Sequence, residues 1–110
     1  MRAVNIREVA QVVRSKNAGP FRLTLDILFK ERAIYEQVKR RGEITAASIA
    51  ALYRLPPDRV TDFVWFDPGK ALKATLIRPT SSGSPRDSDI YGAQQHAPLL
   101  GITLTLDDEP

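Results

Sequence analysis

The sequence has no cysteine, a single histidine and no long apolar run. The absence of cysteine excludes disulfides and thiolate metal sites, and it is typical of the reducing cytosol. A membrane-spanning helix needs about 20 consecutive apolar residues, and the first residues lack the apolar core of a signal peptide. We therefore expect a cytoplasmic protein with no membrane segment.

The residues that are present fit one globular domain over residues 1–110. Hydrophobic residues make up 43% of the sequence and charged residues 26%, which suffices for a core and excludes a chain disordered throughout. Residues 1–54 carry 11 lysines and arginines against 5 acidic residues, whereas residues 55–110 carry 5 against 8. A basic half can attract an anionic ligand, an acidic partner or nucleic acid, although cations that only solvate helices give the same pattern.

The apolar periodicity predicts the order strand, helix, helix, strand, strand, loop, strand. This order suits an α+β fold with an antiparallel four-stranded sheet and helices packed on one face, loosely ferredoxin-like. Residues 5–13 fit a short helix that opens with a capping box, but residues 12–14 also fit the end of a strand. The expected strands span residues 21–29, 60–66, 71–78 and 99–106, the expected helices span 31–41 and 45–55, and 107–110 form an acidic tail.

A first polar stretch, from Arg14 to Pro20, precedes the strand at Phe21 and is predicted to be a site loop. Its two cations, hydroxyl, amide and glycine are groups that hold a phosphate or carboxylate. The spacing is not that of a nucleotide-binding P-loop, and a plain surface turn is the alternative because Asn, Gly and Pro populate turns. The candidate substrate-binding residues here are Arg14, Ser15, Lys16, Asn17 and Gly19.

A second polar stretch, residues 91–98, holds the only histidine, His96. It could serve as a general acid or base, with Gln94 and Gln95 orienting a substrate, or its ring could bond the backbone of a tight turn. With no second histidine or cysteine nearby, we predict no metal site. Asp26 is disfavoured inside a strand, so it either faces water or pairs with a cation as a second candidate catalytic residue.

The long polar connection between these elements is predicted to be mobile. Residues 80–89 carry serines, a glycine and a proline but no large apolar side chain, so burial cannot offset their ordering entropy. We expect a lid over residues 80–89, hinged at Gly83 and Gly92, that closes over a pocket floored by Ser15 to Gly19.

One rival motif concerns DNA. Residues 44–57 resemble the opening of a helix-turn-helix, and the basic half would suit such a partner. The proposed recognition segment, residues 60–66, is strand-like and has no Arg, Lys, Asn or Gln to reach base edges. Nucleic acid is therefore the less favoured partner.

Three segments together resemble a small bacterial family of unknown function. They are residues 14–27, 66–79 and 89–100, and they contain the signatures SKNAG (Ser15 to Gly19) and QQHAPL (Gln94 to Leu99). Members of this family look like partners of, or fusions to, proteins similar to the acyclic terpene utilisation protein A. Relatives of that larger protein are associated with catabolism of branched acids as coenzyme A thioesters.

The resemblance implies that this chain works with a larger protein. The C-terminal domain of that protein is thought to be ferredoxin-like, and its Arg-Ser-Gly-Asp-Lys-Gly loop is similar to Arg14 to Gly19, which lack its glycine and aspartate. The chain would then be the small subunit or accessory domain of a two-component catabolic enzyme that acts on an anionic acid or an acyl-coenzyme A. No catalytic residue and no cofactor follow from the resemblance, and a non-catalytic scaffolding module is the alternative.

Overall fold

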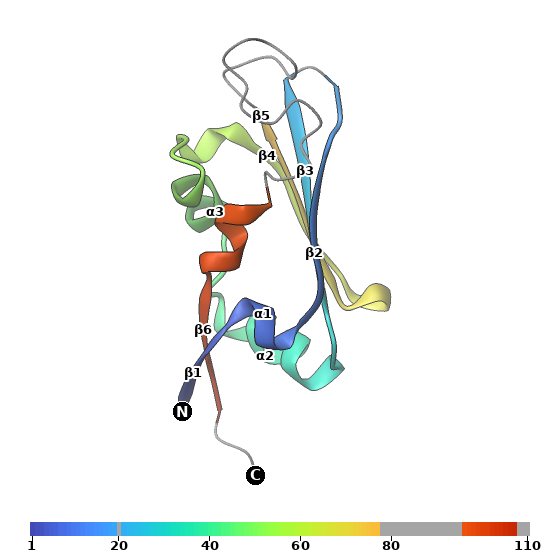
Figure 1. Cartoon of the computed structure of the whole chain (residues 1–110), viewed down its shortest axis with the longest axis vertical. Helices are drawn as coiled ribbons and strands as arrows, with labels where there is room; N and C mark the ends of the chain where they lie inside the picture. The colour runs from blue at the N-terminus through green and yellow to red at the C-terminus, as the bar shows by residue number, and fades with distance from the viewer. Residues whose placement is uncertain (20, 78–95, 108–110) are drawn as a thin grey trace.

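The main element of the fold is an antiparallel four-stranded sheet. The computed structural model describes residues 1–19, 21–77 and 96–107 (Figure 1). The strand order is β2-β3-β5-β4, and every pair of neighbours is antiparallel. The four strands are β2 (Ala10–Asn17), β3 (Arg22–Phe29), β4 (Val60–Phe66) and β5 (Ala71–Ile77).

A smaller sheet and three short helices accompany it. Strands β1 (Arg2–Asn5) and β6 (Thr103–Leu106) pair with each other alone. The helices are α1 (Ile6–Val9), α2 (Arg32–Arg41) and α3 (Ala46–Leu52), and the 3-10 turns are η1 (Pro57–Arg59), η2 (Asp67–Gly69) and η3 (Ala97–Gly101). Within the described ranges, no helix has the length and apolarity to cross a membrane.

The connection from β3 to β4 gives the sheet its topology. Because β3 and β4 are both antiparallel to β5, which lies between them, they run in the same direction. Helices α2 and α3 link them, so the three strands form a split β-α-β unit, the part of the fold that is ferredoxin-like. The α+β class and the antiparallel four-stranded sheet are thus confirmed.

The fourth strand of this sheet is not the expected one. We expected residues 99–106 there, but η3 occupies 97–101, and β6 pairs with β1 instead. The edge position belongs to β2, so the predicted helix over residues 5–13 is wrong beyond Val9. The alternative of a strand at residues 12–14 is confirmed. Pro98 explains part of the difference, because proline suits the first turn of a helix and removes a strand donor.

One face of the main sheet forms the core. The alternate residues of β3, namely Leu23, Leu25, Ile27 and Phe29, are at most 2% exposed and pack into one cluster with residues of the helices and of the small sheet. Figure 1 shows α1, α2, α3 and the small sheet on the same side of the main sheet. We call this the inner face and the opposite one the outer face.

The predicted starts of α1 and α3 and the predicted end of α2 are confirmed, whereas α1 and α3 end earlier than expected. Asn5 and Glu8 form the capping box of α1, and Thr45 forms one with Ser48 at α3. Gly42 ends α2 in the left-handed conformation, with φ of 69°, which glycine adopts without steric penalty. After α3 the chain enters η1 and then β4, so residues 60–66 are a strand and the second helix of a helix-turn-helix is missing.

Polar contacts attach α2 to both sheets. The Tyr35 hydroxyl donates to the Asp67 carboxylate (2.5 Å), which also pairs with Lys39 Nζ (2.8 Å), so the helix is tied to the β4–β5 turn. Burial raises the pKa of Tyr35, and the hydrogen bond to Asp67 adds to that shift.

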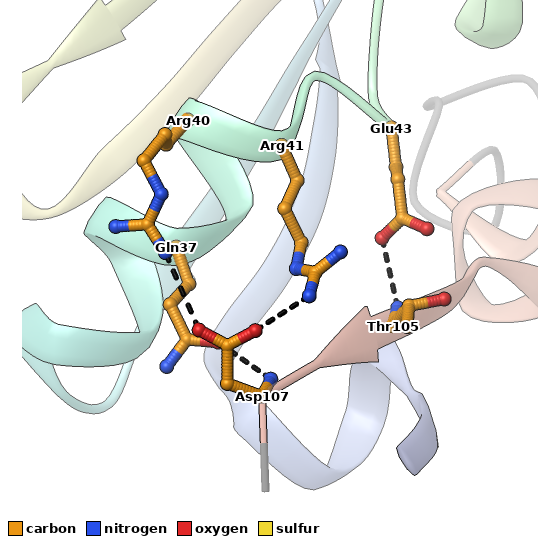
Figure 2. Close-up of polar contacts among 6 residues, drawn as sticks. All are labelled: Gln37, Arg40, Arg41, Glu43, Thr105 and Asp107. Carbon is orange, nitrogen blue, oxygen red and sulfur yellow. Dashed lines mark hydrogen bonds and ion pairs between the residues drawn. The ribbon is translucent and has the colours of Figure 1, made fainter. Parts of the chain in front are cut away.

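The other end of α2 contacts β6. Figure 2 shows Arg40 and Arg41 paired with Asp107, at 3.5 and 2.5 Å. Asp107, predicted to open an acidic tail, is therefore bound to a helix. The rest of that tail, residues 108–110, and the proposed lid at 80–89 lie outside the described residues.

Candidate functional site

The charged residues predicted for the site, Arg14, Lys16 and Asp26, all lie on the outer face. Residues opposite each other in an antiparallel pair project to the same face, so the strand register places these side chains in rows that cross the sheet. One row holds Lys16, Thr24, Thr75 and Asp62, the next Arg14, Asp26, Lys73 and Val64, and the third Val12, Leu28, Ala71 and Phe66.

Asp26 is the centre of the middle row. Arg14 Nε donates to its Oδ2 at 2.9 Å, and Lys73 Nζ lies 3.6 Å from its Oδ1. Asp26 was expected either to face water or to pair with a cation, and it pairs with two. A carboxylate between two cations on adjacent strands is held in place from both sides, which fixes its position on the face.

Asp26 is also the most enclosed charged group of the described chain. It is 8% exposed, although no helix or strand of the described residues lies over the outer face (Figure 1). Its Oδ1 is buried and accepts no hydrogen bond, since Lys73 stays beyond hydrogen-bond distance. A carboxylate oxygen that is shielded from water without a bonded donor retains the capacity to accept one.

The predicted loop from Arg14 to Gly19 is mostly strand. Residues 14–17 belong to β2 and pair with β3, so the assignment of these residues to a loop is wrong. Only the residues after Asn17 turn, with Gly19 at φ of 111° and the Ala18 N–H bonded to the Arg22 carbonyl at 2.9 Å. Binding of an anion therefore depends on side chains of a strand rather than on a curled backbone, and this role stays a prediction.

The strand conformation separates the predicted binding residues. Arg14 and Lys16 project to the outer face, whereas Ser15 and Asn17 lie opposite Leu25 and Leu23 and so belong to the inner face. Ser15 and Asn17 each take part in an interaction of their own. Only the two cations of the signature share a face with Asp26.

His96 lies on the other side of the sheet. It precedes η3, whose Leu99 is fully buried in the inner core, and its carbonyl accepts the Leu99 N–H at 2.9 Å. Its ring is half-buried, and the Nδ1 atom is enclosed without a hydrogen-bond partner. A single site that unites His96 with Lys16 is therefore not what the geometry supports. Gln94 and Gln95 fall outside the described residues.

Sequence reasoning missed two cations of the outer face. Neither Lys73 nor Arg22 was among the candidate site residues, yet Lys73 completes the contacts of Asp26 and Arg22 is exposed at the end of β3. The pairing of Lys73 with Asp26 depends on strand register, which the sequence does not specify. Among the described residues, no group of three or more His, Asp or Glu side chains could hold a metal ion.

The fold and this face define a small α+β domain whose main sheet is covered on one side and charged on the other. The chain belongs to the family described as "Domain of unknown function (DUF4387)", which matches residues 6–103. No curated protein and no solved structure matches the sequence. The predicted membership in a family of unknown function is confirmed, while the proteins with which its members associate stay a matter for proposal.

Proposed function

We propose that this chain is the small subunit or accessory domain of a two-component catabolic enzyme that acts on an anionic acid or an acyl-coenzyme A. The single observation that carries the proposal is the charge of the outer face. Four cations, Arg14, Lys16, Arg22 and Lys73, stand there against the carboxylates of Asp26 and Asp62. A net positive surface attracts phosphates and carboxylates and holds them by charge-assisted hydrogen bonds.

Two of these cations are available for a ligand. Lys16 and Arg22 are exposed, and no ion pair within the described ranges engages them. Arg14 uses Nε for Asp26, and its side chain is 59% exposed, so its other guanidinium donors face solvent. Asp26 fixes the Arg14 stem, and the free donors are thereby presented in a constant direction, which supports bidentate binding of a phosphate or carboxylate.

The partner we propose is a larger protein similar to the acyclic terpene utilisation protein A. The support is the family resemblance together with the outer face, over which no helix or strand lies among residues 1–19, 21–77 and 96–107. In this arrangement the larger protein supplies most of the catalytic groups, and the small chain contributes the cations and Asp26. The reaction would be of the hydratase or lyase type, with Asp26 as the candidate catalytic group of the outer face.

Ligand binding tests the anionic part of the proposal. Acyl-coenzyme A should raise the melting temperature of the purified chain, because a ligand that binds only the folded state stabilises it. Lys16→Ala should reduce this shift, whereas Arg59→Ala, an exposed arginine of η1 away from the outer face, should not.

Co-purification from the native host tests whether the chain associates with the larger protein. A protein that emerges alone and is not stabilised by acyl-coenzyme A contradicts the proposal.

A non-catalytic scaffolding module is the second candidate. It is favoured by the division of the predicted site residues between the two faces, since one substrate cannot contact both Lys16 and His96 across a sheet. The reconstituted complex separates the two functions. If Lys16→Ala and His96→Ala abolish turnover while assembly is intact, scaffolding alone fails; if both only weaken assembly, the enzymatic role fails.

A further inference from the structure

The edge strands of the two sheets differ in whether side chains bond their outward backbone groups. The free edge of β6 is closed by side chains: Glu43 Oε1 accepts the Thr105 N–H at 2.8 Å, and Gln37 Oε1 accepts the Asp107 N–H at 2.9 Å (Figure 2). No comparable contact closes the edge of β4 in the part of the chain that the structure describes, and an open edge is a template for another strand.

The backbone groups that point out of the β4 edge follow from the ladder. Phe29 donates its N–H to the Lys70 carbonyl at 2.9 Å, which sets the alternation of β5: Ala71 and Lys73 direct their backbone groups toward β4. Their opposite residues on β4 are Phe66 and Val64. The intervening Phe63 and Trp65 therefore direct their N–H and C=O groups outward.

The same strand exposes apolar side chains on the outer face. Val64 is 50% exposed and Phe66 46%, although both are residues that sheets normally bury. They lie on either side of Trp65 in a strand that contains no proline and a single charge, Asp62. Proline and charge are the devices with which proteins block edge pairing, so β4 has little protection.

We propose that β4 pairs antiparallel with β4 of a second copy of this chain, with Val64 opposite Val64 at the two-fold axis. In this register Phe63 of one copy faces Trp65 of the other, and all the outward N–H and C=O groups of these residues bond reciprocally. The two main sheets join into one. The occupant is a second copy because the edge is self-complementary in this register.

Side-chain packing favours this register, and charge disfavours the neighbouring register that brings the two Asp62 residues closer. Val64 packs on Val64 of the second copy, and each Phe66 lies diagonally from that valine, so the exposed apolar side chains cover one another. Asp62 faces Phe66 of the second copy, and the two Asp62 carboxylates are four residues apart along the strand, or about 13 Å. A shift by one residue along each strand would bring these like charges to about 7 Å, where repulsion is less screened.

Single cysteines test the register, because the natural chain has none. In a pair without hydrogen bonds between the two residues, Cα atoms are about 4.5 Å apart, within the range of a disulfide. Val64→Cys should therefore form a covalent dimer under mild oxidation. Asp62→Cys, on the same strand and face, should not, because its counterpart is too distant. Equal cross-linking of the two variants would overturn the proposal.

The mass in solution is the second measurement. Light scattering should give the unmodified protein twice the chain mass of 12.3 kDa. Val64→Glu places two carboxylates directly opposite each other and should return the protein to the single-chain mass with an unchanged circular dichroism spectrum, since the side chain is half-exposed. A wild-type protein that stays monomeric at high concentration, or a Val64→Glu variant that still dimerises, contradicts the proposal.

Discussion

The two faces of the main sheet differ in how their residues are stabilised. On the inner face, every alternate residue of β3 is apolar and at most 2% exposed. On the outer face, the same strand carries Arg22, Thr24, Asp26 and Leu28, and its enclosed residue is a carboxylate rather than a hydrocarbon. The inner face stabilises the fold by burial, whereas the outer face depends on charge pairs and retains groups that can bind.

The outer face is itself uneven along the strands. Cations dominate the end near the β2–β3 turn, while Val12, Leu28, Ala71 and Phe66 form an apolar row at the other end. The two proposals use different parts of this face: an anion would bind at the cations of β2 and β3, and the contact with a second copy involves the apolar side chains of β4, the opposite edge strand. Stability and binding are thus separated by face, and the two kinds of binding by position on one face.

The largest expected difference in stability is between truncating an inner-face side chain of β3 and truncating an outer-face side chain of the same strand. Leu25→Ala removes a side chain that is 2% exposed, and such core truncations lower the free energy of unfolding by about 2–5 kcal/mol. Thr24→Ala, the adjacent residue on the outer face, should lower it by about 1 kcal/mol or less. Urea denaturation of both variants measures the difference. Equal losses would mean that the two faces are buried alike.

A smaller effect is expected for the two carboxylates of the outer face. Asp26→Asn keeps the shape but removes the charge that Arg14 and Lys73 share, and we expect a loss of about 1–2 kcal/mol in unfolding free energy. Asp62→Asn is the matched control, because Asp62 is exposed and has no ion pair within the described ranges, and it should change stability by about 0.5 kcal/mol or less.

The same pair of variants distinguishes structure from binding. Raised salt should weaken the wild-type protein more than Asp26→Asn, since that variant has already lost its ion pairs. If Asp62→Asn lowers the free energy of unfolding more than Asp26→Asn does, the ion pairs of Asp26 do not stabilise this face.

Much of the fold could be predicted from local patterns. Alternation predicted β3 and β5, and β-branched and aromatic content predicted β4, each within a residue or two. The end of the helix at residue 41 and the start of the next at residue 45 were also predicted closely, because all these signals depend on neighbours in the sequence. β2 could not be recognised so easily. The irregularity between Ala10 and Val12 breaks its alternation, and the residues after Arg14 have the composition of a turn.

Contacts between distant segments were beyond local patterns. The pairing of β1 with β6 joins the two ends of the described chain, and no periodicity specifies a partner at that separation. The candidate site has the same limit. Asp26 and Arg14 were both singled out from sequence, but their pairing with Lys73 depends on the register of β5, and the position of His96 depends on which face η3 covers.

The smallest expected effect concerns pH and the contacts that attach α2. Hydrogen bonds from Lys39 and Tyr35 hold the pKa of Asp67 below its ordinary value of 3.8. Between the folded and unfolded pKa values the unfolded state binds more protons, so this carboxylate stabilises the fold above that ordinary value, and its contribution is lost as the pH falls through the lowered folded pKa.

Asp67→Asn should therefore reduce the loss of stability that the wild-type protein shows at acidic pH, which flattens the acid limb of its stability curve. Asp58→Asn, an exposed carboxylate of η1 without a described polar contact, should leave the limb unchanged. Thermal melts between neutral and acidic pH measure both, and an unchanged acid limb in Asp67→Asn would show that the attachment of α2 to the β4–β5 turn does not depend on this charge.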